Sequence, residues 1–334
     1  MSTVMNSIKE KGYVDQKIDK NIDLVEAIRK LKKEKNAVIL GHFYITSELQ
    51  EISDFVGDSL GLAREASRTD ADIIVFLGVH FMGETAKILN PNKKVILPDL
   101  NASCSLAESA PADAFKAFKE KYPDHKVLSY INCTADIKAL SDVIVTSSNA
   151  VQIVESFPKD EKIIFAPDKN LGSYINSLTD REMVLWDGAC IVHERYSLEK
   201  ILKMKEEHLD AEFIAHPECE QPLLIVADYV GSTTALLRYS TEVSKAKKFI
   251  VATESGILHQ MKKDAPDKTF IPAPSIDATC GCNDCEFMKL NTLEKLYNTL
   301  KFELPEIELT DKQIEEAKKP IERMLEISNR LGIK

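Results

Sequence analysis

A concealed threefold repeat is the feature that most restricts the fold of this 334-residue chain. In each copy an aspartate lies 12 residues after a leading polar residue, and a hydroxyl residue lies 5 residues after the aspartate. The leading residues are His42, Tyr130 and His216, so the copies repeat at intervals of 88 and 86 residues. These periods are much longer than those of solenoid repeats, and each copy therefore has the size of a small domain.

Each copy shows the same alternation of helical and strand patterns. An amphipathic helix comes first, with apolar residues at helical spacing, such as Leu24, Ile28 and Leu31. Short apolar strands follow it. The first strands are 37–40, 126–129 and 212–215, the second long strands are 72–77, 162–165 and 248–252, and the final strands are 95–97, 183–186 and 269–271. Such alternation is typical of parallel sheets covered by helices on both faces, and it predicts an α/β fold of αβα units.

We expect four segments along the chain. The first αβα unit with its N-terminal helix covers 1–106, the second unit 107–193, the third unit 194–290, and the C-terminal helices 291–334. The C-terminal helices are joined around Leu304 and Pro305, and Pro320 is expected to kink the last helix or mark a break in it. Ligands of parallel sheets bind beyond the carboxyl ends of the strands. Three similar units thus predict one active site on a pseudo-threefold axis.

The overall composition excludes several classes of partner. A net charge of −10 argues against nucleic acid or an anionic membrane as the principal partner. The chain has no run of about 18 apolar residues, and residues 1–35 lack the apolar segment of a signal peptide. The seven cysteines therefore indicate thiols, metal ligands or redox groups instead of a disulfide framework. We expect a cytoplasmic protein.

Hydroxyl residues stand where the aspartate-led strand of each copy turns into a helix. They are Ser59, Ser147 and Thr233, with Ser232 beside the last. Taken alone, each is explained as a helix N-cap. Three helix starts directed at one axis would also place free backbone N–H groups and positive dipole ends around an anion. The repetition therefore favours a binding site for phosphate or carboxylates.

A pair of polar side chains ends the first strand of each copy. The pairs are His42 with Tyr44, Tyr130 with Asn132, and His216 with Glu218. Because alternate residues of a strand point to the same side, both members of each pair are expected to face the same way. A single histidine or tyrosine in such a place is usually a structural group. Recurrence in all three copies favours proton donors and acceptors around a ligand.

One or more cysteines follow the last strand of each copy. Cys104 and Cys190 do so in the first two copies, and the third copy ends in Cys280, Cys282 and Cys285. One thiolate from each copy would hold an iron–sulfur cluster and leave one iron open, and an open iron acts as a Lewis acid in dehydration. The alternative is that Cys104 and Cys190 are small buried residues and that the third group alone binds zinc.

Three further residues near these motifs have simpler alternatives. Cys133 and Cys219 lie beside the polar pairs, and we expect them to be small packed thiols. His193 follows Cys190 by three residues. It either hydrogen-bonds to a substrate beside the iron–sulfur cluster or caps the next helix, and we favour the first role.

Motifs along nearly the whole chain resemble those of the quinolinate synthase family, the A protein of de novo NAD biosynthesis. The matching stretches occur in family order at 41–44, 54–60, 78–82, 84–89, 97–100, 104–106, 130–132, 145–150, 167–172, 193–195, 216–219, 228–233 and 288–297. The resemblance implies three αβα domains about a pseudo-threefold axis. It also implies a [4Fe-4S] cluster held by one cysteine per domain, which here are Cys104, Cys190 and Cys285.

The resemblance further implies a reaction, in which iminoaspartate condenses with dihydroxyacetone phosphate to give quinolinate, phosphate and two waters. An open iron of the [4Fe-4S] cluster is the implied Lewis acid. The residues implied to position the intermediate or move protons are Tyr44, Tyr130, His193, His216 and Glu218. Those implied to bind carboxylates or phosphate are His42, Ser59, Asn132, Ser147, Ser232 and Thr233. An aspartate oxidase or dehydrogenase is the implied source of iminoaspartate.

Two other functions are compatible with the residues. One is a different dehydratase that uses a three-cysteine iron–sulfur cluster on a related substrate. The other is an iron–sulfur or zinc sensor whose cysteines report the redox state and whose anion pocket binds an effector. In anaerobically purified protein, about four iron and four sulfide per chain favour a cluster, whereas zinc favours the sensor.

Overall fold

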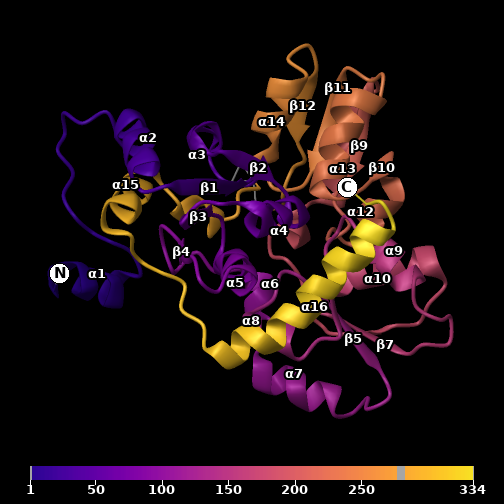
Figure 1. The fold of residues 1–334 in the computed structure, drawn as a ribbon. Helices are drawn as coiled ribbons and strands as arrows, with labels where there is room; N and C mark the ends of the chain where they lie inside the picture. Colours follow the sequence, from indigo (N-terminus) through magenta and orange to yellow (C-terminus); the bar gives the residue numbers. More distant parts are fainter. Residues whose placement is uncertain (1, 277–282, 334) are drawn as a thin grey trace. The chain divides into compact units, whose positions relative to one another are not determined.

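The computed structural model describes residues 2–276 and 283–333. The chain forms two compact units: unit 1 comprises Met1–Cys104 and Glu286–Lys318, and unit 2 comprises Ser105–Cys285 and Lys319–Lys334. Over the described ranges, three four-stranded parallel sheets with helices beside them form the framework (Figure 1). One sheet lies in unit 1 and two lie in unit 2. The predicted α/β class with parallel sheets is confirmed.

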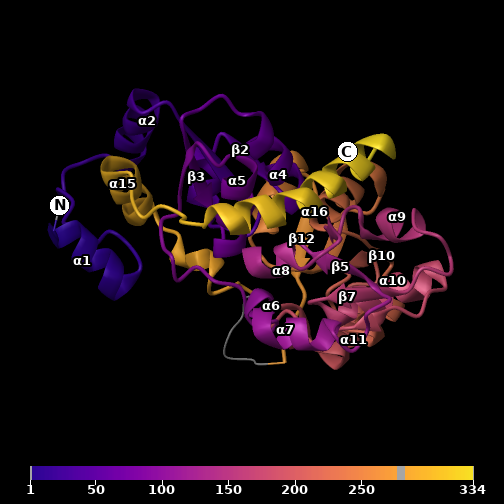
Figure 2. The same cartoon turned by 60° about the horizontal axis from the view of Figure 1, so that its bottom comes forward.

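Unit 1 contains the first sheet, with strand order β2-β1-β3-β4. Its strands are β1 (Ala37–His42), β2 (Phe55–Gly57), β3 (Ile73–Leu77) and β4 (Lys94–Ile96). Its helices are α1 (Ser2–Lys11), α2 (Leu24–Glu34), α3 (Ser47–Ile52), α4 (Ser59–Arg68), α5 (His80–Leu89), the short η3 (Met288–Leu290) and α15 (Leu293–Phe302). Helices α2 and α15 lie side by side (Figures 1 and 2). Strand β3 is buried at every position, as its continuous apolar run predicts.

Unit 2 contains two sheets, with strand orders β6-β5-β7-β8 and β10-β9-β11-β12. The strands are β5 (Lys126–Tyr130), β6 (Val143–Val145), β7 (Ile163–Ala166), β8 (Val184–Leu185), β9 (Ala211–Ala215), β10 (Tyr229–Val230), β11 (Lys248–Ala252) and β12 (Thr269–Pro272). The helices are α6 (Ser105–Glu108), α7 (Ala112–Lys119), α8 (Ala135–Ala139), α9 (Ala150–Glu155), α10 (Lys169–Thr179), η1 (His193–Arg195), α11 (Leu198–Glu207), α12 (Gln221–Val226), α13 (Thr233–Arg238), η2 (Tyr239–Val243) and α14 (Ile257–Asp264).

The three sheets share one strand order, in which the first strand of each copy (β1, β5 or β9) lies between the next two strands along the chain. This common order is the structural counterpart of the repeat in the sequence. Each sheet also lies within one of the ranges 1–106, 107–193 and 194–290 predicted for the αβα units. The pseudo-threefold arrangement of the three units and their boundaries stay predictions.

The aspartate of the repeat has the same structural role in every sheet. The carboxylates of Asp54, Asp142 and Asp228 each accept a hydrogen bond, 2.7–2.9 Å long, from the backbone N–H of a first-strand residue 15 positions earlier. Each aspartate N–H donates in return to the carbonyl oxygen of that same residue. A lysine side chain also pairs with each carboxylate. The aspartate thus fastens the short strand that follows it (β2, β6 or β10) to the first strand of each copy (β1, β5 or β9).

The last helix differs from the prediction at its proline. Helix α16 (Asp311–Arg330) begins after the Leu304–Pro305 joint and continues through Pro320, so the predicted break there is wrong. A proline inside a helix costs about 3 kcal/mol. The apolar side chains of Ile321 and Met324, which follow it, are fully buried, and burial of each contributes about 2 kcal/mol. Packing therefore outweighs the lost backbone hydrogen bond.

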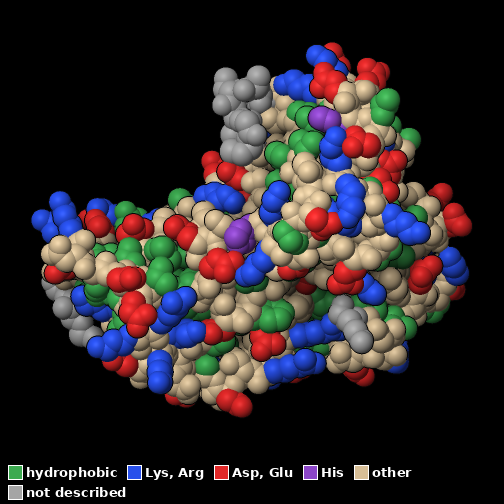
Figure 3. Space-filling view, turned by 90° about the horizontal axis from the view of Figure 1, so that it is seen from above, with side chains coloured by type: hydrophobic (Ala, Val, Ile, Leu, Met, Phe, Trp, Pro, Cys, Tyr) green, Lys and Arg blue, Asp and Glu red, His purple; other side chains and the backbone are tan. Residues whose placement is uncertain are grey.

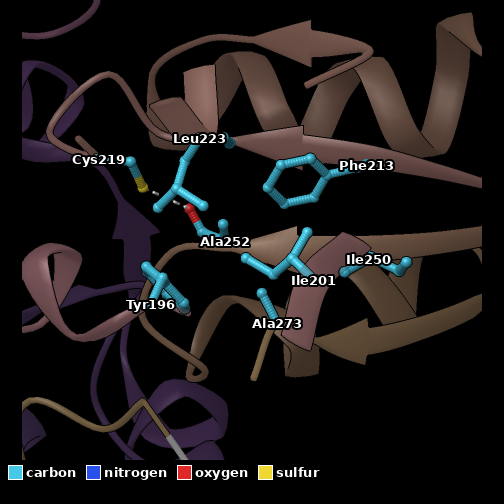
Figure 4. Packing of buried hydrophobic residues seen from close by; sticks show 9 residues of the cluster. Tyr196, Ile201, Phe213, Cys219, Leu223, Ile250, Ala252 and Ala273 are labelled. Carbon is cyan, nitrogen blue, oxygen red and sulfur yellow. Dashed lines mark hydrogen bonds between the residues drawn. The ribbon is translucent and has the colours of Figure 1, made fainter. Parts of the chain in front are cut away.

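Cys219 is packed in the hydrophobic core beside the third sheet. Cys219 packs among Tyr196, Phe213, Leu223 and Ala252 (Figure 4). Its thiol donates a hydrogen bond to the carbonyl oxygen of Ala252 at 3.5 Å, and burial raises the pKa of this thiol well above its usual value. The prediction of a packed thiol is confirmed for Cys219. The side chain of Cys133 is likewise fully buried.

The surface carries charges of both signs. Figure 3 shows Lys and Arg side chains interspersed with Asp and Glu side chains on the face in view. In the part of the chain that the structure describes, no helix is both long and apolar enough to cross a membrane.

Candidate active site

Three buried polar side chains from both sheets of unit 2 meet at the carboxylate of Glu218. Together with Glu218 they form the Glu218 group, whose members are Tyr130, His193, His216 and Glu218. Tyr130 ends β5, His216 directly follows β9, and His193 begins η1. All of them are at most 4% exposed. These residues lie at the carboxyl ends of parallel strands or in the loops beyond them, where ligands of such sheets bind.

Both oxygens of the Glu218 carboxylate have close partners. The hydroxyl of Tyr130 donates a hydrogen bond to Oε1 at 2.6 Å. Nδ1 of His193 lies 3.0 Å from Oε2, and Nδ1 of His216 lies 3.8 Å from Oε1. The His193 contact lacks hydrogen-bond geometry, so we treat it as an electrostatic contact. The two imidazole rings also face each other, with centroids 4.9 Å apart and planes tilted by 31°.

The partners of Glu218 determine its protonation. Burial alone raises the pKa of this carboxyl, but the neighbouring His193 and His216, with the hydrogen bond from Tyr130, outweigh burial and lower the pKa to about 2. Glu218 is therefore a carboxylate at neutral pH. A buried carboxylate that accepts a hydrogen bond from a phenol orients the phenolic O–H beside it, and the two groups can take part in proton transfer together.

A second buried carboxyl, for which the sequence predicted no role, lies near Glu218. Asp168 caps α10 by accepting a hydrogen bond from the backbone N–H of Leu171 at 2.7 Å. Its other oxygen is buried and has no hydrogen-bond partner among the described residues. Burial, and next the charge of Glu218, raise the pKa of Asp168 well above its usual value. Of these two carboxyls, Asp168 holds the proton and Glu218 the charge.

The second ring nitrogen of His193 also has a close partner. Nε2 lies 3.1 Å from the hydroxyl of Thr253, the residue that follows β11. The backbone oxygen of Thr253 in turn accepts a hydrogen bond from the Tyr196 hydroxyl at 2.5 Å. Helix α11, the next helix, is capped by Ser197, so the alternative that His193 caps it is wrong. Thr253 was missed by sequence reasoning because one threonine after a strand carries no distinctive signal.

Cys190, His193 and Glu218 form a candidate metal site. One ligand atom of each residue lies within 4.8 Å of those of the other two. Thiolate, imidazole and carboxylate groups are ligands of transition metals. The buried Nδ1 of His193 also has no hydrogen-bond partner in the described part of the chain. The donors present therefore suit a metal group bound at Cys190.

The other predicted cysteine ligands have different positions. Cys285 is half-buried in unit 2, and its backbone N–H donates a hydrogen bond to Glu254 at 3.1 Å. Cys104 is half-buried and is the last residue of the first segment of unit 1. Cys280 and Cys282 lie outside the described residues.

Two of the polar pairs have the same local geometry. In unit 1, Nδ1 of His42 accepts a hydrogen bond from the backbone N–H of Tyr44 at 3.2 Å, and the two rings meet edge to face at 4.5 Å. In unit 2, Nδ1 of His216 accepts one from the N–H of Glu218 at 3.3 Å. In both pairs the two residues are in contact, but Tyr44 and Glu218 lie in turns that follow the strands, so strand alternation is not what brings them together.

The hydroxyl residues only partly match the N-cap interpretation. Ser232 caps α13 by accepting a hydrogen bond from the backbone N–H of Ala235 at 3.3 Å, and Thr233 begins the helix. Helix α4 is instead capped by Asp58, so Ser59 is its first residue. Adjacent aspartate and serine are both good N-caps, and the sequence alone does not select between them.

In the second copy the helix begins later than predicted. Helix α9 starts at Ala150, three residues after Ser147, which leaves Ser147 half-buried in the turn before it. The neighbouring Ser148 hydroxyl donates a hydrogen bond to Ser232 at 2.9 Å, so the hydroxyl loops of the second and third copies are in contact. Oδ1 of Asn132 is buried and has no hydrogen-bond partner among the described residues. A group of this kind is suited to bind a ligand.

The chain is similar to known proteins over most of its length. Residues 26–326 match the family model described as quinolinate synthetase A protein. The quinolinate synthase of Thermosynechococcus vestitus is 60% identical over 307 residues, which cover 92% of this chain and 96% of that protein. The quinolinate synthase of Synechocystis sp. is 60% identical over 306 residues, which cover 92% of this chain and 96% of that protein.

Proposed function

The chain belongs to the quinolinate synthetase A family, and from this premise we propose that it is a quinolinate synthase. In the proposed reaction, iminoaspartate and dihydroxyacetone phosphate condense to quinolinate with loss of phosphate and two waters. The observation that carries the proposal is the Glu218 group. Its four members, which the family resemblance implies as substrate-positioning or proton-moving residues, come from distant parts of the chain and meet as one buried set.

We propose that Cys104, Cys190 and Cys285 hold a [4Fe-4S] cluster. Two structural observations support this ligand set. The Cys190 thiol lies within 4.8 Å of ligand atoms of His193 and Glu218, and Cys285 is tied through Glu254 to the same strand end that holds His193. When bound, such a cluster supplies an open iron that acts as a Lewis acid on a departing hydroxyl or on a carbonyl.

The Glu218 group supplies the proton transfers. Loss of water requires a base for the C–H bond next to the departing hydroxyl. Tyr130 and Glu218 share a hydrogen bond of 2.6 Å, and Glu218 or a tyrosinate at Tyr130 removes the substrate proton. His193 and His216 contact the same carboxylate and stabilise its charge, and they provide donors for the leaving oxygen. Their burial keeps water away and strengthens these electrostatic effects.

Neutral donors bind the anionic groups of the substrates. Asn132, Ser147, Ser232 and Thr233 in unit 2 are uncharged, so they can hold a carboxylate or phosphate without protonating it. In unit 1, the proposed substrate contacts are His42 and Tyr44 at the end of β1 and Ser59 at the start of α4. The site residues in both units therefore stand at strand ends or helix starts.

The test is the production of quinolinate by the anaerobically prepared protein. Iminoaspartate is unstable and is generated in the assay by an aspartate oxidase or dehydrogenase, the proposed partner enzyme, in the presence of dihydroxyacetone phosphate. We expect quinolinate only when all components are present. A protein that contains the [4Fe-4S] cluster but forms no quinolinate would contradict the proposal and favour a different dehydratase or a sensor.

A further inference from the structure

Residues 283–285 are fastened side by side to the ends of two neighbouring strands. The side-chain amide of Asn283 donates a hydrogen bond to the carbonyl oxygen of Ala273, just after β12, at 2.5 Å. The hydroxyl of Ser255, just after β11, donates to the carboxylate of Asp284. Strands β11 and β12 are paired in the sheet, so these attachments fix the segment at one sheet edge.

Glu254 provides the third attachment. Its side chain is 1% exposed. Oε1 accepts a hydrogen bond from the backbone N–H of Cys285 at 3.1 Å, and Oε2 accepts one from the backbone N–H of Gly256 at 2.7 Å. Both partners are donors, so both carboxylate oxygens are needed as acceptors. The carboxylate therefore holds the backbone of Cys285 against the end of β11.

Thr253, the residue before Glu254, contacts His193. The Thr253 hydroxyl lies 3.1 Å from Nε2 of His193, whose ring neighbours the Cys190 thiol. Two consecutive residues after β11 therefore orient the imidazole beside Cys190 and the backbone of Cys285. The end of β11 thus acts as a common support for the parts of unit 2 that contribute thiols.

We propose that Glu254 is the positioning residue of Cys285, which directs the Cys285 thiolate toward the iron–sulfur cluster. This inference rests on the proposed function, because it takes Cys285 as a ligand. Residues that orient metal ligands from outside the ligand set typically change metal affinity or activity by about 10- to 100-fold when they are removed. Glu254 also places a negative charge next to a ligand, which lowers the reduction potential of a bound cluster.

The test compares Glu254→Gln with the wild type in the anaerobically purified full chain. The amide has the same shape but only one acceptor oxygen, so it cannot serve both backbone N–H groups. We expect iron release to a chelator to be about 10- to 100-fold faster and the reduction potential to be more positive. The matched control is Glu242→Gln, because Glu242 is exposed and pairs with Arg238 at 3.4 Å. The control should match the wild type.

A second variant keeps the test decisive if Glu254→Gln fails to fold. Glu254→Asp keeps both acceptor oxygens on a side chain that is one methylene shorter, and we expect its iron release to lie between that of the wild type and that of Glu254→Gln. If Glu254→Gln does not fold, as judged by circular dichroism, Glu254→Asp decides. Wild-type iron release and potential in the folded variants would overturn the role of Glu254. A wild-type chain without a cluster would instead overturn the proposed function.

Discussion

Two buried carboxyl groups with opposite protonation dominate the site at the scale of single residues. Glu218 is surrounded by a phenol and two imidazoles, which lower its pKa, while burial and the charge of Glu218 raise the pKa of Asp168. Environments that separate the pKa values of neighbouring acids are common at sites of proton transfer. Glu218 therefore carries the negative charge of this pair, while Asp168 releases its proton at a higher pH than Glu218 does.

Replacement of Glu218 by glutamine tests the proton-transfer role. Glu218→Gln keeps the shape but removes the negative charge beside the Tyr130 hydroxyl, so we expect the rate of quinolinate formation to fall by about two or more decades. The absorbance of the iron–sulfur cluster should remain. Steady-state assays and the visible spectrum measure the two effects, and Glu220→Gln, at an exposed neighbour, is the control. Near-normal turnover would remove Glu218 from the proton transfer.

The raised pKa of Asp168 predicts a pH-dependent stability. The folded protein keeps a proton on Asp168 that the unfolded chain releases above the ordinary aspartate pKa of 3.8. This contribution is fully present below that pH and is lost as pH rises toward the folded pKa, by up to about 1.4 kcal/mol per pH unit. Asp168→Asn keeps an acceptor for Leu171 and removes the titration. Urea unfolding from pH 5 to 8 should show a smaller decline for the variant, whereas parallel pH profiles would contradict this assignment.

At the scale of elements, the repeated aspartates link neighbouring strands by side-chain hydrogen bonds to the backbone. Asp142 accepts from the backbone N–H of Val127 at 2.9 Å, and the equivalent bonds recur in the other two sheets. Asp142→Ala leaves this N–H without its partner, so we expect the free energy of unfolding to fall by about 1.5–3 kcal/mol. Chemical denaturation measures it, with Asp160→Ala at an exposed position as the control. Equal stabilities of the two variants would show that the bond is dispensable.

Strands were easier to predict than helix ends. Continuous apolar runs located β1, β5 and β9 to within two residues, because burial on both faces leaves little choice of side chain. Helix starts depend on which of several neighbouring polar residues forms the cap, and α4 uses Asp58 instead of Ser59. The predicted break at Pro320 is wrong for a different reason, since the packing that keeps α16 continuous is not visible in a local pattern, while the alternative of a kink stays a prediction.

At the scale of the whole molecule, the repeat identified the residues that meet but not those that support them. It singled out Tyr130, His216 and Glu218, which are far apart in sequence and lie together in unit 2. Asp168 and Glu254 were not identified, because an acidic residue after a strand is common. Its protonation and its hydrogen-bond partners depend on residues that are distant in the sequence. A motif that recurs can be recognised in the sequence. Contacts between loops can be recognised only in the folded structure.

The central claim is that one cysteine from each copy of the repeat holds a shared iron–sulfur cluster. The most direct measurement is the iron, sulfide and visible absorbance of single Cys→Ala variants prepared anaerobically. We expect Cys104→Ala, Cys190→Ala and Cys285→Ala each to lose the intact cluster and quinolinate formation, while Cys280→Ala retains both with about four iron per chain. A complete cluster in any of the first three variants, or its loss in Cys280→Ala, would contradict the claim.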